Sequence, residues 1–289
     1  MRLGIAIDSR MCMACYCCFT ACKDEHCGYD TALSKKQPMM GQQWMDVREW
    51  ERSDSSRLVK VASVPTPCSH CQDPACMKAA KDGAVYKRPD GIVIIDPVKS
   101  RGQKAIVDAC PIGAVFWNEE FQIPQKCTMC AELLDDPKYL SYLGGSRFKI
   151  PRCVEACPNR ALIFGDLDDP ESGICKVIAA NRVTQLEPLE GVKTNVVHLN
   201  IPTVYLAGTV YYPKAMEEVC IGAKVKLSCR ETGEIYEMAT NYFGDWEFEW
   251  LPKKKNFNIE ITMDGYKPVT YNAFTDVDHY VGMTYLEKA

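Results

Sequence analysis

Short runs in which apolar and polar residues alternate fill the C-terminal third of the chain. Residues 204–211 and 223–229 alternate with the period of a β-strand that buries one face. A turn signal, Asn-Tyr-Phe-Gly-Asp at 241–245, precedes a further alternating run at 246–250. Regular short strands between turns predict an antiparallel β-sandwich or barrel of about seven strands over residues 201–289.

The first 165 residues follow a different plan, because they repeat one unit made of a short strand, a Cys-rich loop, a helical turn and a second strand. Residues 157–162, Cys-Pro-Asn-Arg-Ala-Leu, resemble residues 110–115, Cys-Pro-Ile-Gly-Ala-Val. Residues 166–200 have a mixed composition and are predicted to be a linker, with a short helix possible at 176–185. The chain is therefore predicted to belong to the α+β class.

Twelve of the 17 cysteines follow a ferredoxin spacing. The intact motif is Cys-x2-Cys-x2-Cys-x3-Cys at residues 12–22. A second run, Cys-x2-Cys-x4-Cys, begins at Cys68 without a fourth cysteine, and Cys110 stands alone before a proline. The last set joins a Cys-x2-Cys pair at Cys127 to a Cys-x3-Cys-Pro segment at Cys153. Three closely spaced cysteines with a remote Cys-Pro are typical of two-cluster bacterial ferredoxins, which hold [4Fe–4S] clusters.

In such ferredoxins the fourth cysteine of each run binds the other cluster, so the spacing predicts three ligand sets. These are Cys12, Cys15, Cys18 and Cys157 for the first cluster, Cys22, Cys127, Cys130 and Cys153 for the second, and Cys68, Cys71, Cys76 and Cys110 for the third. The same repeats predict a nested pair of ferredoxin-like modules over residues 1–165. One module, at about residues 63–118, is inserted between the two halves of the other.

A fourth cluster of this pattern has lost all its ligands together. Counting by the motif spacing from Cys76 and from Cys110 reaches Ala80, Ser100, Gln103 and Ile106. No other predicted cluster lacks a cysteine, whereas random loss would have left single ligands behind. We therefore predict three [4Fe–4S] clusters and one emptied site, whose space these four side chains now fill.

Disulfide bonds and structural zinc sites are the two other chemistries that use many cysteines. Disulfides suit secreted chains, and no secretion signal is seen here. Structural zinc suits Cys-x2-Cys pairs, above all Cys127 and Cys130, but does not require a third near cysteine and a remote Cys-Pro.

Five cysteines lie outside the ferredoxin pattern. Cys229 alternates in phase with Val225 and Leu227, so it is predicted to be a core residue of a strand. Cys17 could compete with Cys18 as a ligand, but the spacing favours Cys18. The remaining three are given a structural or incidental role: Cys27, Cys175 and Cys220.

Composition and charge exclude some classes of function. The formal net charge of -4 gives no basic surface, so no nucleic-acid partner is expected. Residues 1–8 lead directly into the first motif, with neither an apolar signal region nor a twin-arginine pair. The longest uncharged stretch, 195–213, is interrupted by polar residues and prolines and is not expected to span a membrane. We expect a cytoplasmic chain, while folded export on a partner's signal stays open.

The pattern predicts electron transfer without catalysis in this chain. A [4Fe–4S] cluster passes one electron at a time. The sequence has no Ser-His-Asp set, phosphate loop or dinucleotide fingerprint, so no catalytic residue is assigned and the active site is expected on a partner. Of the four histidines, His70 lies between Cys68 and Cys71. It could tune that cluster or pack at an interface, but a solvated or hydrogen-bonding loop histidine is the simpler interpretation.

Two segments then point to a known family. Residues 110–114 and 126–130, Lys-Cys-Thr-Met-Cys, resemble the four-cluster ferredoxin-type subunits of the dimethyl-sulfoxide-reductase family of molybdopterin enzymes. The missing fourth cluster and the β-domain narrow the resemblance to the small subunits of pyrogallol–phloroglucinol transhydroxylases. The runs similar to those subunits are 91–97, 117–120, 125–136 and 240–244.

This resemblance implies a cytoplasmic heterodimer. Its large catalytic subunit would hold molybdopterin guanine dinucleotide with molybdenum or tungsten, together with a phenolic substrate. Internal hydroxyl transfer needs no net electrons, whereas reductive dehydroxylation needs an electron pair, and the sequence leaves both open. The alternative is the electron-transfer subunit of a membrane-associated respiratory molybdopterin reductase, which usually keeps four clusters. A zinc-stabilised interaction protein is a third possibility.

Overall fold

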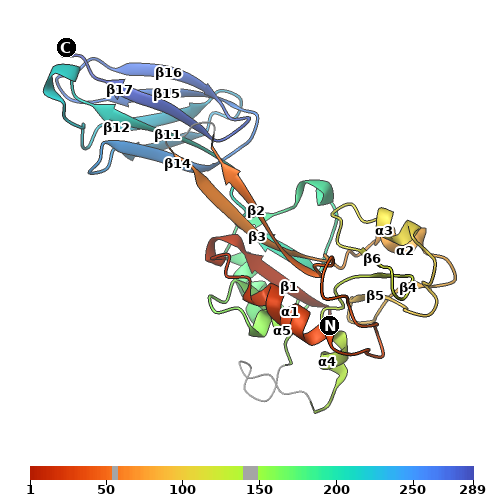
Figure 1. The fold of residues 1–289 in the computed structure, drawn as a ribbon. Coiled ribbons are helices and arrows are strands. Elements are labelled where there is room, and N and C mark those ends of the chain that lie inside the picture. Colours follow the sequence, from red (N-terminus) through yellow and green to blue (C-terminus); the bar gives the residue numbers. More distant parts are fainter. Residues whose placement is uncertain (54–57, 139–148) are drawn as a thin grey trace. The chain divides into compact units, whose positions relative to one another are not determined.

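The computed structural model describes residues 1–53, 58–138 and 149–289. Over these residues the chain forms two compact units (Figure 1). The first unit consists of Met1–Glu49 and Ser63–Ile201, and the second of Trp50–Ala62 and Pro202–Ala289. The second unit therefore contains a short segment from the N-terminal half as well as the predicted β-domain.

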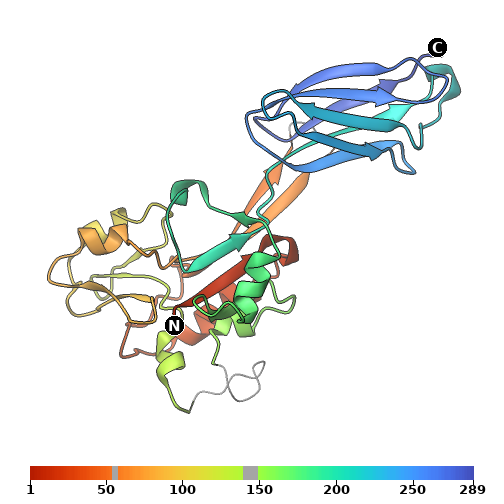
Figure 2. The same cartoon turned by 180° about the vertical axis from the view of Figure 1, so that it is seen from behind.

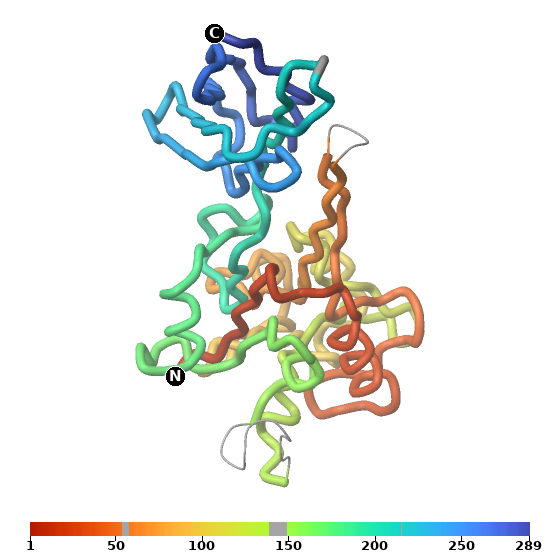
Figure 3. The backbone as a smooth tube through the Cα atoms, turned by 90° about the vertical axis from the view of Figure 1, so that its left-hand side faces the viewer, coloured from red at the N-terminus to blue at the C-terminus, as the bar shows by residue number. Residues whose placement is uncertain are grey.

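A four-stranded sheet, ordered β8-β1-β10-β9, forms the frame of the first unit (Figures 1 and 2). Its strands are β1 Leu3–Asp8, β8 Leu162–Asp166, β9 Val183–Thr184 and β10 Val196–Leu199. β1 pairs antiparallel with β8 and parallel with β10, so the red first strand runs beside green segments from much later in the chain (Figure 3). Ile5 and Ile7 face a core that contains the cysteines, while Ala6 packs with Leu199 and Ile174 on the other face.

The other elements of the first unit are short. Its helices are α1 Cys17–Cys27, α2 Ala75–Ala79, α3 Ala105–Asp108, α4 Ala131–Asp135, α5 Arg152–Glu155 and α6 Gly173–Ala179, with the 3-10 turns η1 Ser9–Met11 and η2 Glu187–Leu189. The two-stranded sheets are β4 Val85–Lys87 with β5 Val93–Ile95, and β6 Phe116–Asn118 with β7 Ile123–Gln125. Within the described parts of the chain, no helix is both long and apolar enough to cross a membrane.

Residues 166–200, predicted as a linker, supply two strands and a helix to the first unit. The strands are β9 and β10, and β10 lies directly beside β1. The helix α6 begins earlier than residues 176–185 suggested, because Ser172 caps its N-terminus: the Ser172 hydroxyl accepts a hydrogen bond from the Cys175 N–H at 3.3 Å.

A small separate core lies within the segment predicted as the inserted module. It is formed by buried apolar side chains of α2, α3 and the β4–β5 hairpin, including Val85, Ile95 and Ile106. The hairpin of β2 Met45–Arg52 and β3 Lys60–Pro67 leaves this first unit, because each of the two strands has one end in the first unit and the other in the second.

Two packed sheets build the second unit, in the orders β14-β11-β17 and β13-β12-β15-β16. The strands are β11 Val204–Tyr211, β12 Lys224–Cys229, β13 Ile235–Ala239, β14 Asp245–Leu251, β15 Asn256–Thr262, β16 Val269–Phe274 and β17 His279–Tyr285, and η3 Lys214–Met216 follows β11. Val225, Leu227 and Cys229 point into the core, which confirms the alternation read from the sequence. The purely antiparallel prediction is wrong for one pair, since β11 and β17 run parallel.

Candidate metal centres

The first predicted ligand set converges on one small pocket. Cys12, Cys15, Cys18 and Cys157 line it, among apolar neighbours such as Leu162. The helix α1 starts at Cys17, so Cys18 turns into the protein while Cys17 is exposed and is absent from the pocket lining. This geometry agrees with the choice of Cys18 over Cys17 that the spacing favoured.

The third predicted set lines a second small pocket. Cys68, Cys71, Cys76 and Cys110 surround it, and its wall is completed mainly by apolar side chains and by Ser69 and His70 of the same loop. Cys76 is carried by α2, and Cys110 follows α3.

The second predicted set is the most deeply buried. Cys22 on α1, Cys153 on α5, and Cys127 and Cys130 beside α4 all belong to the main core of the first unit or are buried at its edge. Burial raises the pKa of Cys130, and the charges of the other three cysteines raise it further, so the set shares one region.

The loops that carry these cysteines share a local geometry. The residue two positions after the first cysteine of each loop has a left-handed φ: 53° at Ala14, 44° at His70 and 56° at Met129. This turn lets backbone N–H groups point at sulfur, as between Met129 N and Cys127 Sγ at 3.3 Å. The Cys-Pro segments repeat a second contact, from Ala114 N to Cys110 Sγ at 3.3 Å and from Ala161 N to Cys157 Sγ at 3.2 Å.

Burial makes these thiols poor acids in the absence of a cation. Desolvation raises the pKa of Cys18 and of Cys127 to about 12, and that of Cys71 and of Cys76 to about 11. Buried thiolates are stable only when they bind a metal or pair with a charge. All 17 cysteines are free, so no disulfide uses them.

Buried cationic charge accompanies these sulfurs. Lys126 is 3% exposed, and its ammonium group donates to the carbonyls of Val93 and of Cys127, the latter at 3.0 Å. It acts to lower the pKa of Cys76 and of Cys127, against the larger effect of burial. A buried ammonium with only carbonyl partners is costly, and a nearby anionic centre would compensate it.

The donor set suits a multi-iron cluster. In a [4Fe–4S] cluster each of four cysteines binds a different iron, so the sulfurs surround a space larger than a single ion occupies. No three His, Cys, Asp or Glu side chains in the described ranges come close enough to share one metal ion. Four-cysteine pockets with apolar walls and N–H donors aimed at sulfur therefore fit the cluster.

The four motif positions that carry no cysteine are occupied by packed or hydrogen-bonded residues. Ile106 is fully buried in the small core, and Ala80 packs against the same core. The Gln103 amide accepts from Lys81 N at 2.8 Å and donates to Lys99 O at 2.8 Å. Within residues 1–53, 58–138 and 149–289, the buried Ser100 hydroxyl has no hydrogen-bond partner.

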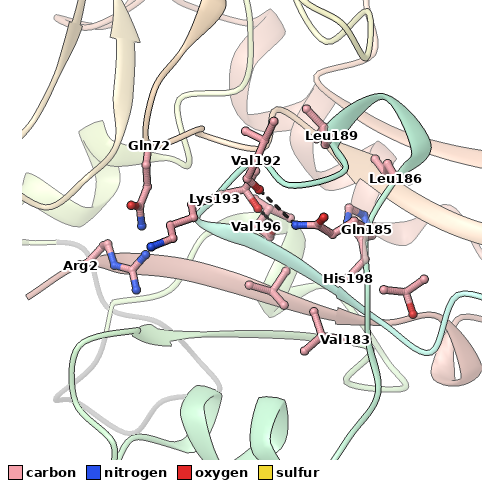
Figure 4. A pocket seen from close by; sticks show the side chains of 13 residues that line it. Arg2, Gln72, Val183, Gln185, Leu186, Leu189, Val192, Lys193, Val196 and His198 are labelled. Atoms are coloured by element: carbon pink, nitrogen blue, oxygen red, sulfur yellow. Dashed lines mark hydrogen bonds between the residues drawn. The ribbon is translucent and has the colours of Figure 1, made fainter.

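A larger pocket adjoins the Cys68–Cys110 site and has a different character (Figure 4). Leu189 lines both pockets, and Gln72 follows Cys71 directly. The side chains of Arg2, Gln72 and Lys193 point toward one another at one end, as Figure 4 shows. No carboxylate among the described residues lines this pocket, and Arg2 Nε at its polar end donates to Asp168 Oδ1 at 3.1 Å.

His26 is the neighbour of the cysteines that the sequence analysis did not single out. Its Nε2 lies 3.6 Å from Cys130 Sγ and its Nδ1 lies 3.2 Å from Glu132 Oε1, while the ring packs on Trp44. Burial lowers the pKa of His26, although Glu132 acts to raise it. The signal was present in the sequence, because His26 is four residues after Cys22 on one helix and therefore shares its face.

His70 is hydrogen-bonded and not solvated, and its partner lies on β5, outside its own loop. The Val93 backbone N–H donates to His70 Nδ1 at 3.0 Å, and the side chain is fully buried.

Comparison with known proteins agrees with this site. The model of the "4Fe-4S dicluster domain" family matches residues 59–167. The pyrogallol hydroxytransferase small subunit of Pelobacter acidigallici is 34% identical over 270 residues, which are 90% of this chain and 90% of that protein. A sulfite dehydrogenase subunit of Allochromatium vinosum is 33% identical over 66% of this chain and 80% of its own length. One chain of the anaerobic dimethyl sulfoxide reductase of Escherichia coli is 33% identical over 58% of this chain and 75% of its own length.

The near full-length match at this identity, the family model and the clustered cysteines lead to one assignment. This protein belongs to the family of 4Fe-4S iron–sulfur subunits that transfer electrons in molybdopterin oxidoreductases.

Proposed function

We propose that this chain carries three [4Fe–4S] clusters and delivers electrons to a molybdopterin subunit that acts on phenolic compounds, by hydroxyl transfer or reductive dehydroxylation. The observation that carries the proposal is the match to the pyrogallol hydroxytransferase small subunit, because it extends over 90% of both chains and so includes the β-domain. The respiratory relatives match shorter shares of this chain.

The three clusters are assigned to the ligand sets expected from the spacing. Cys12, Cys15, Cys18 and Cys157 hold the first, Cys22, Cys127, Cys130 and Cys153 the second, and Cys68, Cys71, Cys76 and Cys110 the third. Two of the sets line one pocket each, and the members of the remaining set lie within electrostatic reach of one another, which supports this assignment. The filled position around Ile106 supports a count of three.

The same repeats support nested ferredoxin-like modules within residues 1–165, with about 63–118 inserted, a connecting segment at 166–200 and a β-domain at 201–289. The left-handed residues Ala14, His70 and Met129 at matching places in three cysteine loops are what a repeated ancestral unit would leave behind. The similar contacts of Ala114 and Ala161 support it too.

The partner in this proposal is a large catalytic subunit in a cytoplasmic heterodimer. It would hold molybdopterin guanine dinucleotide with molybdenum or tungsten, and this chain would contribute no catalytic residue. Met11, Met13 and Tyr16 surround the first cysteine pocket and are 48%, 62% and 39% exposed. Exposed apolar side chains gathered at the rim of a redox site suit a docking face, since such patches mark protein–protein contacts and the cores of interfaces are apolar.

A respiratory role is the second candidate. A tetrathionate reductase subunit of Salmonella typhimurium is 30% identical over 71% of this chain and 75% of its own length. A role of that kind would couple this chain to a membrane-associated reductase and make net electron flow obligatory.

Elemental analysis of the native complex, purified without oxygen through a tag on this chain, tests the proposal. Three cubanes require about 12 Fe for this chain. Molybdenum or tungsten near one per complex, together with turnover of a polyhydroxylated phenol, is the expected result. Zinc with little iron would contradict the electron-transfer role, whereas iron with molybdenum and activity only on sulfur oxyanions or S-oxides would favour the respiratory candidate.

A further inference from the structure

His70 occupies an unusual place in the Cys68–Cys71 loop. Its backbone is left-handed, with φ 44°, and its N–H donates to Cys68 Sγ at 3.5 Å. The side chain is fully buried and lines the pocket formed by Cys68, Cys71, Cys76 and Cys110. A histidine rarely adopts this backbone without a structural reason.

The hydrogen-bond partners of His70 determine which ring nitrogen carries a hydrogen. Nδ1 accepts from the Val93 backbone N–H at 3.0 Å, so Nδ1 presents a lone pair. In a neutral imidazole the hydrogen is then on Nε2, on the other side of the ring. That Nε2 is buried and has no partner among the residues that the structure describes.

The adjacent side chain repeats this pattern. Ser69 also lines the pocket, and its hydroxyl is buried without a partner in the described ranges of the chain. Buried polar groups in proteins are nearly always paired, so two unpaired donors at one small pocket indicate a missing acceptor there. In the other cysteine loops the residue that matches His70 is Ala14 or Met129, neither of which has a side-chain donor.

We propose that His70 donates a hydrogen bond from Nε2 to a sulfur of the cluster held by Cys68, Cys71, Cys76 and Cys110. Ser69 adds a second donor to the same cluster. Hydrogen bonds to sulfur stabilise the added negative charge of the reduced cluster and so raise its midpoint potential. The inference rests on the proposed ligand set. The two hydrogen bonds would make this cluster easier to reduce than it would be in a loop without these donors.

Two substitutions at position 70 distinguish a hydrogen bond donated by the His70 side chain from an effect of its packing alone. Asparagine tolerates a left-handed backbone and can accept from Val93 N, but it is too short to replace Nε2. Glutamine is longer and can place its amide N–H near the position of Nε2. His279→Asn in the second unit is the matched control.

The readout is an EPR-monitored redox titration of the anaerobic complex. His70→Asn is expected to make the reduction equilibrium of one cluster about tenfold less favourable. For a one-electron couple this lowers the midpoint potential by about 59 mV. The other clusters should not shift, His70→Gln should recover part of the loss, and His279→Asn should match the unmodified complex. Full iron with no shift in His70→Asn would overturn the proposal.

A measurement on a complex that keeps His70 makes the test decisive even if His70→Asn loses iron. Pulsed EPR of the reduced complex with 15N-labelled histidine in a His26→Gln background should detect an imidazole nitrogen coupled to a cluster. No such coupling would overturn the proposal. Iron analysis of the same samples distinguishes the two levels of inference, because fewer than about 12 Fe contradicts the cluster count, whereas unmoved potentials with full iron contradict only the role of His70.

Discussion

Arg52 and Asp278 form a buried, two-pronged ion pair between segments 226 residues apart in the sequence. Arg52 Nε donates to Asp278 Oδ2 at 3.0 Å and Arg52 Nη2 donates to Oδ1 at 2.8 Å, and the side chains are 5% and 11% exposed. Asp278 Oδ1 also accepts from Tyr205 N at 2.9 Å. The pair therefore joins the segment 50–62 to the strands of the second unit, to which both belong.

Replacing Arg52 by methionine should destabilise the second unit by about 3–5 kcal/mol, because it leaves Asp278 buried without its partner. Urea unfolding of the anaerobic complex, followed by tryptophan fluorescence, measures this loss. Lys226→Gln breaks an exposed pair with Glu237 at 3.8 Å and should change stability by less than about 1 kcal/mol. Equal losses of unfolding free energy in the two variants would show that the buried ion pair stabilises the protein no more than the exposed one.

Restoring cysteines at Ala80, Ser100, Gln103 and Ile106 should add a fourth cluster, since these side chains themselves fill the position. The expected iron content rises from about 12 to about 16 per chain. A triple variant that keeps Ile106 is the control, and it should gain no cluster because one ligand is missing and the buried side chain remains. An unchanged iron content in the quadruple variant would mean that more than ligand loss closed this site.

Lys126→Met should lower the midpoint potentials of the neighbouring clusters. The buried ammonium interacts with the sulfurs of Cys76 and Cys127, which belong to different predicted sets, so two of three potentials should fall together. Redox titration with EPR detection measures the shifts. Lys224→Met on the exposed surface of β12 removes the same charge far from any cysteine set in sequence, and all potentials should stay constant.

Asp8 should make the first unit sensitive to acid. Burial acts to raise the pKa of Asp8, but hydrogen bonds from Arg10 and Asn200 outweigh it, so the pKa lies below the usual 3.8. A carboxyl whose pKa is depressed in the folded state stabilises that state above its unfolded pKa, and the contribution is lost as pH falls through the folded pKa. Asp8→Asn should cost about 1–3 kcal/mol near neutral pH and progressively less below pH 4.

Anaerobic thermal scans of the Asp8→Asn complex at several pH values provide the measurement. Asp46→Asn removes a more exposed carboxylate, paired with Arg48 at 3.2 Å, and serves as the control. A difference between Asp8→Asn and the unmodified complex that stays constant down to the acid limit would contradict the role of ionised Asp8.

Met13→Glu should weaken the complex with the catalytic subunit. A charge at this 62% exposed position would be desolvated on docking, with no partner provided for it. In size-exclusion chromatography at decreasing concentration, the Met13→Glu complex should dissociate at a higher concentration than the unmodified complex. Met216→Glu, at a position that is 43% exposed in the second unit, should leave that concentration unchanged. Unchanged association would show that the docking face does not include the rim of the first cysteine pocket.

Local patterns predicted what depends on local spacing. The cysteine loops and the alternating strand β12 could be predicted from the sequence, because the spacing of a motif and the alternation along a strand depend only on residues that are close in sequence. The parallel pairing of β11 with β17, the place of β10 beside β1 and the assignment of 50–62 to the second unit depend on contacts between distant segments. The spacing of His26 from Cys22 on α1 could have placed it beside the cysteines, whereas the contact of the Lys126 ammonium with the Val93 carbonyl depends on the fold.

The pairing of β1 with β8 and β10 also constrains when the protein can be assembled. Strand β1, at residues 3–8, can complete its pairing only after β8 at residues 162–166 and β10 at residues 196–199 have been synthesised. At translation rates of about 5–20 residues per second that wait lasts roughly ten to forty seconds. During it the first cysteine run is a nascent, unfolded segment with no sheet to hold it. In the proposed ligand set the first cluster cannot be completed before Cys157 has been synthesised, so a chaperone or scaffold that shields the thiols of residues 12–18 has a defined interval in which to act.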